Sequence, residues 1–137
     1  PAPRTRGTRA RGGAMSAGAW VLLATLGGLG AVARLVVGSA VVAAARGAQL
    51  PLGTLFVNLT GSFALGLLVG ASVSGTAIFV LGAGLLGSYS TFSSWMMEAA
   101  LEIEWGRRRL ALAYLVLSLA GGLAAIFLGR ALATALT

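Results

Sequence analysis

The side chains best suited to chemistry stand in one polar run, Ser88-Tyr-Ser-Thr-Phe-Ser-Ser-Trp95, inside an otherwise apolar stretch. Its hydroxyls, aromatic ring edges and indole N–H can each donate a hydrogen bond or offer partial positive charge to a small ion. The amide of Asn58, in the preceding apolar stretch, is a further donor. These groups suit weak, sequential binding of an ion better than covalent catalysis.

The side chains that most enzymes use are missing from this sequence. It has no Cys and no His, and its acidic residues are three Glu with no Asp. Ser-His-Asp and Cys-His catalysis, disulfide bonds and zinc sites built on His or Cys are therefore excluded. The sequence predicts a protein that is not an enzyme.

The elements that position the polar groups are long and apolar. Of the 137 residues, 58% are hydrophobic and 9% are charged, whereas about a quarter of a soluble domain is charged. Four stretches each approach the roughly 20 residues that cross a bilayer: Trp20 to Ala45, Leu50 to Ser72, Thr76 to Met97 and Leu110 to Leu132. Their short connections favour antiparallel neighbours. We expect an all-α integral membrane protein in which residues 15–137 form one domain of four transmembrane helices.

Glycine spacing predicts close contacts between these helices. Gly66 and Gly70 have GxxxG spacing, and Gly121 and Gly122 are adjacent in the fourth stretch. Small residues at such positions let two helix backbones approach each other closely in a membrane.

The net charge of +7 comes from ten Arg and three Glu. Four Arg fall in residues 1–14, which are either a disordered basic tail or sequence upstream of a true start at Met15. Three more form the run Arg107 to Arg109. These positions suit contacts with membrane lipid, and no nucleic-acid-binding module is recognisable outside the apolar stretches.

The polar run also predicts that the third helix is broken near its middle. Hydroxyl side chains compete for backbone groups, and Gly87 favours a break just before them. Broken backbone at membrane depth must be buried in protein or line a cavity, and its carbonyls can hold a small cation. The alternative is a hydroxyl-rich helix that stays continuous.

Three polar motifs occur in order, one in each of the first three stretches. They read GGxGAxxR at residues 27–34, GTLxVNxxGSFxxG at 53–66 and GxxGSxSTFSSW at 84–95. Together they resemble the signature segments of the bacterial fluoride channels, the CrcB or Fluc family. The resemblance implies a fluoride-specific ion channel that exports fluoride passively across the bacterial plasma membrane and so relieves fluoride toxicity. It also implies an antiparallel, dual-topology dimer, of two copies or of this chain with a related, oppositely oriented subunit, with a structural, non-transported sodium ion at its centre.

The resemblance gives roles to particular residues by their motif positions. It implies that Asn58 is the pore-lining amide and that Phe92 and Trp95 occupy the two positions of the family's phenylalanine pair. It also implies that the backbone carbonyls of Gly87 and Ser90 hold sodium. Trp95 departs from the family's Phe, because its indole is larger and adds an N–H donor. The alternative is that Trp95 is a packing or interface aromatic.

Further hydroxyl donors for the anion pathway are Thr91, Ser93, Tyr114 and Ser118. Tyr114 and Ser118 lie four residues apart, so they share one face of the last helix and can extend a polar track. The family's track continues with another hydroxyl one turn on, where this sequence has Gly122. The alternatives are that Tyr114 anchors the helix at the membrane interface and that Ser118 bonds to its own helix.

Arg34 is the one strong charge well inside the first stretch, and an intramembrane Arg indicates a functional or organising role. It could attract anions at a vestibule or fix the first helix by bonding backbone carbonyls. The alternative is that Arg34 ends the first span and extends its guanidinium to the interface.

Two other classes of protein remain as alternatives. A proton-coupled exporter needs a carboxylate inside the bundle, whereas Glu98, Glu102 and Glu104 lie at the end of the third stretch. A non-transporting membrane subunit would need neither Asn58 nor a broken helix.

The positions of Arg also bear on orientation. In a chain that begins at Met15, the first and third connections carry four Arg and the other side carries Arg130, which favours one fixed orientation with the N-terminus outside. With the four Arg of residues 1–14 included, that other side carries five Arg against four, so the bias nearly vanishes, as dual topology requires.

Overall fold

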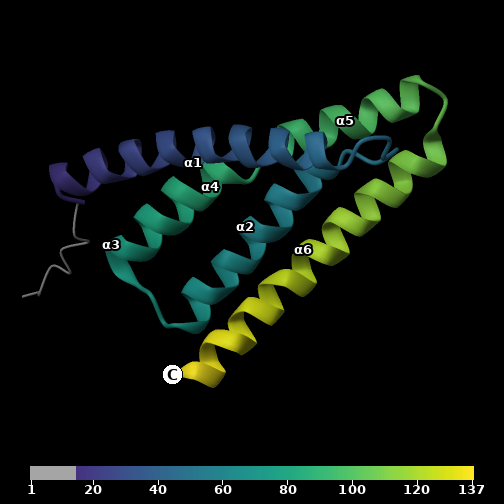
Figure 1. The fold of residues 1–137 in the computed structure, drawn as a ribbon. Helices are drawn as coiled ribbons and strands as arrows, with labels where there is room; N and C mark the ends of the chain where they lie inside the picture. Colours follow the sequence, from purple (N-terminus) through teal and green to yellow (C-terminus); the bar gives the residue numbers. More distant parts are fainter. Residues whose placement is uncertain (1–14) are drawn as a thin grey trace, which may run out of the picture.

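The structure, a computed structural model, describes residues 15–137. Figure 1 shows their helical arrangement, in which successive long helices run back and forth. The basic tail predicted for residues 1–14 lies outside the described residues.

Within residues 15–137, four helical segments are long and apolar enough to cross a membrane, as the sequence predicts. Three are continuous helices: α1 (Ala17–Ala44), α2 (Leu52–Gly70) and α6 (Arg108–Leu136). The third segment is bent and is made of four pieces, α3 (Gly75–Ile78), the π-helix η1 (Phe79–Leu86), α4 (Gly87–Tyr89) and α5 (Phe92–Glu104). The bend therefore falls inside the polar run.

The third span continues beyond its predicted end at Met97, because α5 ends at Glu104. The backbone N–H of Gly106 then bonds the Ile103 carbonyl at 2.9 Å and that of Arg107 bonds the Glu102 carbonyl at 2.8 Å. Gly106 has a φ of 76°, which glycine adopts without steric cost and which completes this C-terminal cap. The chain reverses here through three residues and enters α6 at Arg108.

The contact between α2 and α6 is close because glycines face backbone across it, and Figure 1 shows the two helices side by side. A Cβ on Gly66 would collide with the carbonyl oxygen of Ile126, and one on Gly70 would lie 2.5 Å from that of Arg130. From the other helix, a Cβ on Gly129 would collide with the carbonyl oxygen of Phe63. The predicted close packing at Gly66 and Gly70 is confirmed.

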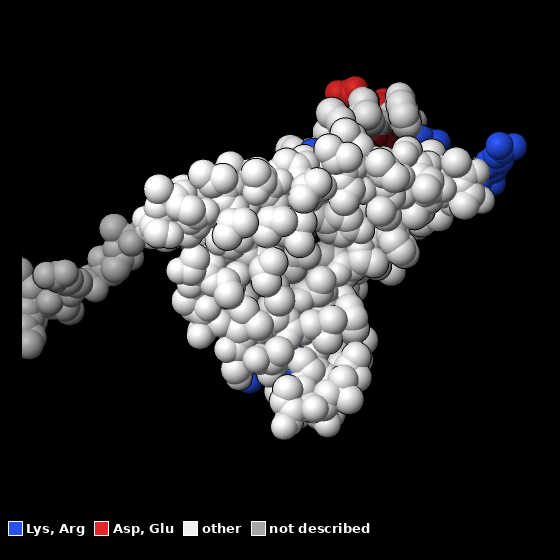
Figure 2. Space-filling model, turned by 60° about the vertical axis from the view of Figure 1, so that its left-hand side comes forward, with Lys and Arg blue, Asp and Glu red and all other residues white. Residues whose placement is uncertain are grey.

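The outer surface suits lipid rather than water. Large apolar side chains such as Leu35, Phe127 and Leu128 are more than 60% exposed, and Figure 2 shows a face that is almost wholly uncharged. Charged groups gather where α5 meets α6, including the ion pair of Arg107 Nε with Glu102 at 2.6 Å. Apart from Arg34 and Glu98, which lie within their helices, the charged residues of the described chain stand near helix ends, as is typical of transmembrane bundles.

Candidate functional site

The bend in the third span is fixed by a side chain from α2. Ser90 and Thr91 have extended backbone, with φ/ψ of −80°/160° and −147°/126°. The Asn58 amide pairs with this segment in both directions, since its Nδ2 donates to the Thr91 carbonyl at 2.9 Å and its Oδ1 accepts from the Thr91 N–H at 2.7 Å. Asn58 thereby supplies the hydrogen bonds that the extended backbone cannot make within a helix.

The same bend deprives two carbonyl oxygens of their usual helical donors. In a continuous helix, the N–H of Thr91 would bond the Gly87 carbonyl and that of Ser94 would bond the Ser90 carbonyl. Here the Thr91 N–H donates to Asn58 and the Ser94 N–H donates to Thr91 Oγ1 at 3.3 Å. The carbonyls of Gly87 and Ser90 are therefore available as ligands.

Free carbonyl oxygens are hard ligands that suit a small cation. Within residues 15–137 no cluster of His, Cys, Asp and Glu is placed to hold a metal ion. The carbonyl oxygens of Gly87 and Ser90 are of the donor type that such a cation takes.

A cavity of about 280 Å³ opens beside the bend, between α2, α5 and α6. None of its lining residues is charged; they are Asn58, Ser62, Ser90, Thr91, Phe92, Trp95, Ser118, Leu119, Gly122, Leu123 and Ile126. We call it the polar cavity. It brings together five of the seven residues that the sequence predicts for the anion pathway, whereas Ser93 and Tyr114 are outside its lining.

The two aromatic residues of the polar cavity form an edge-to-face pair. The ring centroids of Phe92 and Trp95 are 5.5 Å apart, and the ring planes make an angle of 74°. The Phe92 side chain is 70% exposed, so the cavity reaches the protein surface. Aromatic ring edges carry partial positive charge, which can contact an anion without binding it as strongly as a full charge would.

Two residues that line the polar cavity each have a buried polar atom with no hydrogen-bond partner within residues 15–137. Trp95 Nε1 and Ser118 Oγ are both buried and unpaired, and Ser118 is only 8% exposed. Ser118 thus makes no hydrogen bond to its own helix, so the alternative that it bonds to its own helix is wrong. An unpaired buried polar group costs about 1–3 kcal/mol unless a bound species pairs with it.

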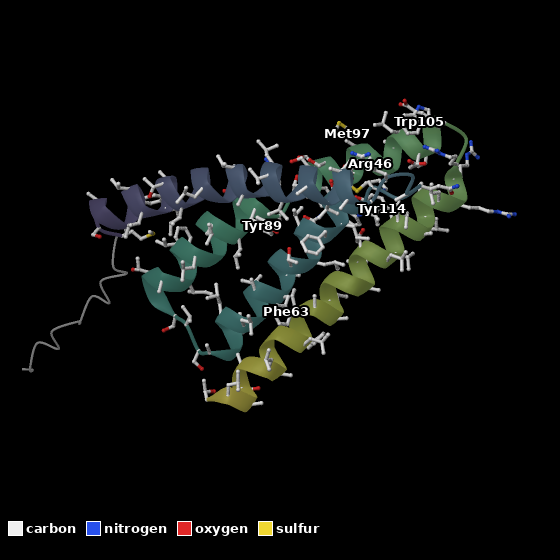
Figure 3. All side chains as sticks on the ribbon, viewed as in Figure 1. Arg46, Phe63, Tyr89, Met97, Trp105 and Tyr114 are labelled. Carbon is white, nitrogen blue, oxygen red and sulfur yellow. The ribbon has the colours of Figure 1, made fainter. Side chains whose placement is uncertain are left out.

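Tyr114 instead takes part in a second polar cluster, which the sequence motifs did not predict. Its ring is fully buried, and its hydroxyl donates to Glu98 Oε2 at 2.6 Å. Thr54 Oγ1 donates to the other oxygen, Oε1, also at 2.6 Å. Figure 3 shows Tyr114 at the end of the molecule where α2, α5 and α6 meet.

The sequence contained a signal for this cluster. Thr54 and Asn58 lie four residues apart on α2 and so share one face of it. Glu98 was expected at the end of the third span, but α5 continues for six residues beyond it. Its carboxylate consequently lies inside the bundle, which corrects that expectation.

Arg34 lies in a second cavity, of about 400 Å³, on the other side of the bend. Glu98, Thr54 and Ser94 also line this cavity, which we call the charged cavity. Thr91 lines both cavities, so the two cavities adjoin at the extended segment that Asn58 holds.

Comparison with known proteins agrees with this arrangement. Residues 21–130 match the family described as "CrcB-like protein, Camphor Resistance (CrcB)". The chain is 45% identical over 114 residues to "Fluoride-specific ion channel FluC 2" of Mycolicibacterium paratuberculosis, covering 83% of this chain and 93% of that protein. It is 42% identical over 118 residues to "Fluoride-specific ion channel FluC 1" of Symbiobacterium thermophilum, covering 82% and 95%. With its four apolar helices, it is a multi-pass protein of the bacterial plasma membrane and not an enzyme, and it belongs to the CrcB-like family, the family of these fluoride channels.

Proposed function

We propose that this protein is a fluoride-specific channel that lets fluoride leave the cell passively and thereby relieves its toxicity. The observation that carries the proposal is the polar cavity, where Asn58, Trp95 and Ser118 converge from three helices and no charged side chain is present. Fluoride is small and strongly hydrated, so a pore must replace its water with hydrogen-bond donors. Uncharged donors can do so without holding the ion too long.

The pathway that we propose contains Asn58, Thr91, Phe92, Trp95 and Ser118 at the polar cavity. Ser93 adjoins it through the contact of its hydroxyl with Thr91 Oγ1 at 3.3 Å. The position of Tyr114 beside Glu98 places it toward the charged cavity. There Arg34 would attract the anion from bulk water before it reaches the uncharged segment.

The working form that we propose is a dimer of oppositely oriented subunits with one structural sodium ion at its centre. The carbonyls of Gly87 and Ser90 support this, because they lack their helical donors and lie in the segment that Asn58 holds extended. Sodium would draw these oxygens together and so keep the bend rigid. The exposed Phe92 ring supports a second subunit that covers the open side of the polar cavity.

The interior carboxylate of Glu98 makes a proton-coupled exporter the second candidate. A proton carrier must exchange its proton in the course of each cycle. Both oxygens of Glu98 are instead held by donors at 2.6 Å. That geometry suits a fixed acceptor that organises three helices, and it therefore favours the channel.

The deciding experiment is reconstitution of the purified chain in liposomes, with fluoride and chloride efflux followed by ion-selective electrodes. We expect fluoride efflux that needs no pH gradient and chloride efflux at the level of protein-free liposomes. Absence of fluoride efflux, or equal chloride efflux, would contradict the proposal. Efflux that stops when the pH gradient is collapsed would favour the exporter.

A further inference from the structure

We propose that the indole N–H of Trp95 is a direct hydrogen-bond donor to the anion and sets selectivity in the polar cavity. The inference rests on the proposed function and concerns a donor that a Phe at this position cannot supply. It follows from the environment of one atom, Trp95 Nε1, compared with those of the other two indoles in the chain.

The first observation is that this N–H is unused. Trp95 Nε1 is buried and has no acceptor within residues 15–137. An indole N–H is a donor only, so no rotation can turn it into an acceptor for a neighbouring hydroxyl. A buried Trp usually pairs its N–H, and here an acceptor must therefore come from outside the described chain.

The second observation is that residues with other unused polar groups line the same cavity as Trp95. Trp95 and Ser118 line the same cavity, and Ser118 Oγ is also buried and unpaired. Asn58 uses one N–H of its amide on the Thr91 carbonyl, and the amide carries two. Three helices thus bring residues with unused hydrogen-bonding groups to the lining of one uncharged cavity. An anion or water can accept from all three groups, whereas a cation could pair only with the Ser118 hydroxyl.

The other two tryptophans show what a lipid-facing indole looks like in this protein. Trp20 is 55% exposed and Trp105 is 62% exposed, and neither lines the polar cavity. Trp105 packs instead against the Arg107 guanidinium, 4.8 Å from its ring centroid. Trp20 also pairs edge to face, with Phe79, so ring pairing does not distinguish Trp95. Trp95 differs from both because its N–H is buried without an acceptor within residues 15–137.

The consequence is selectivity by hydrogen-bond strength. Fluoride is close to water in size and is a much stronger acceptor than chloride. The shielded N–H can therefore donate to fluoride after a small side-chain adjustment, whereas chloride is larger and forms a weaker hydrogen bond. Donation to an ion is stronger than donation to a neutral group, so this N–H offsets part of the cost of removing water from fluoride.

The test is an NMR titration of the full chain in lipid nanodiscs with ¹⁵N-labelled tryptophan, which gives three indole N–H signals. Trp95→Phe, Trp20→Phe and Trp105→Phe assign them. Sodium fluoride is compared with sodium chloride at constant sodium, so that any effect of the cation cancels. We expect a saturable shift of the Trp95 signal with fluoride, little shift with chloride, and no saturable shift of the other two.

A tryptophan analogue with sulfur in place of the indole N–H, inserted at position 95, removes the donor but keeps the ring. Fluoride affinity, followed through the Asn58 side-chain amide signal, should fall by about tenfold or more, as expected for a lost hydrogen bond to a charged partner. The same analogue at position 105 should leave affinity unchanged.

Two results would overturn the inference. The first is a Trp95 signal that does not shift with fluoride, or that shifts equally with chloride. The second is an unchanged fluoride affinity with the analogue at position 95. If wild-type liposomes conduct fluoride in either case, the proposed channel function stands and only the role of the N–H is lost. If wild-type liposomes do not conduct, the proposed function itself fails.

Discussion

The Asn58 side chain and the Thr91 peptide group pair in both directions, with Nδ2 2.9 Å from the Thr91 carbonyl oxygen and Oδ1 2.7 Å from the Thr91 nitrogen. One amide on α2 therefore replaces the helical hydrogen bonds lost at the bend between α4 and α5. The same pairing leaves the Gly87 carbonyl without its helical donor and places Asn58 at the wall of the polar cavity. A change at Asn58 should consequently affect both the pathway and the bend.

Asn58→Asp should abolish fluoride efflux. A carboxylate can still accept from the Thr91 N–H, but it cannot donate to the Thr91 carbonyl, and it opposes an anion in the cavity. Two like charges about 4 Å apart repel by about 4 kcal/mol at an effective dielectric constant of about 20, which corresponds to roughly a thousandfold loss. The measurement is fluoride efflux from liposomes, and Gln49→Glu makes the same amide-to-carboxylate change on the exposed connection between α1 and α2. Equal losses in the two variants would contradict the prediction.

Phe92→Ile should stop conduction without unfolding the protein. The variant loses the aromatic edge at the polar cavity, but Phe92 is 70% exposed in the subunit, so little packing within the chain is lost. Phe127→Ile is the matched control, because Phe127 is 65% exposed and does not line the cavity. We expect normal helix content by circular dichroism for both variants and fluoride efflux for the control alone. Full efflux through Phe92→Ile would place the pathway elsewhere.

Tyr114→Phe should destabilise the bundle by about 1.5–3 kcal/mol, because it removes a hydrogen bond to a charged group. Glu98 then keeps Thr54 as its remaining hydrogen-bond donor. Tyr89→Phe is the control: it removes a bond between neutral hydroxyls, Tyr89 with Thr60 at 2.9 Å, and such bonds average about 0.6 kcal/mol in membrane proteins. Reversible unfolding in mixed micelles measures both losses. Equal losses would show that Glu98 does not strengthen its bond to Tyr114.

Gly66→Ala should separate α2 from α6, because the added Cβ meets the backbone carbonyl of Ile126. Overpacking of this kind costs about 1–3 kcal/mol. Gly28→Ala is the control, since a Cβ there meets nothing within 4 Å in the subunit. Thermal unfolding in detergent should show a lower midpoint for Gly66→Ala than for Gly28→Ala. Identical midpoints would mean that the contact between α2 and α6 is looser than described.

A chain that begins at Met15 should insert with the connections after α1 and α5 in the cytoplasm. These connections hold Arg46 and the run beginning at Arg107, and Figure 3 shows Arg46 and Trp105 at the same end of the molecule. Since the sequence has no Cys, Ala48→Cys and Thr137→Cys each provide a single site for a membrane-impermeant thiol reagent. In intact cells, Thr137→Cys should react and Ala48→Cys should not. Equal reaction at both sites would indicate dual topology.

The length of the apolar stretches was enough to predict four membrane spans, and the order of the polar motifs was enough to predict the family. The ends of the spans were less predictable. The third span was expected to stop before its acidic residues, yet α5 includes them. Glu102 pairs with Arg107 just after the helix, whereas Glu98 finds its partners in Thr54 on α2 and Tyr114 on α6. A local reading of hydropathy contains no information about such distant partners.

The sequence by itself determined the class of protein, because a chain so apolar and so poor in charge can be stable only where lipid covers its outer faces. It also pointed to Asn58, Phe92 and Trp95, because they stand at motif positions that resemble those of the fluoride channels. Only the tertiary structure decided how those residues are arranged. Hydrogen bonds between helices depend on packing distances rather than on spacing along the chain. In the folded protein Asn58 pairs with Thr91, Tyr114 donates to Glu98, and the N–H of Trp95 has no partner within residues 15–137.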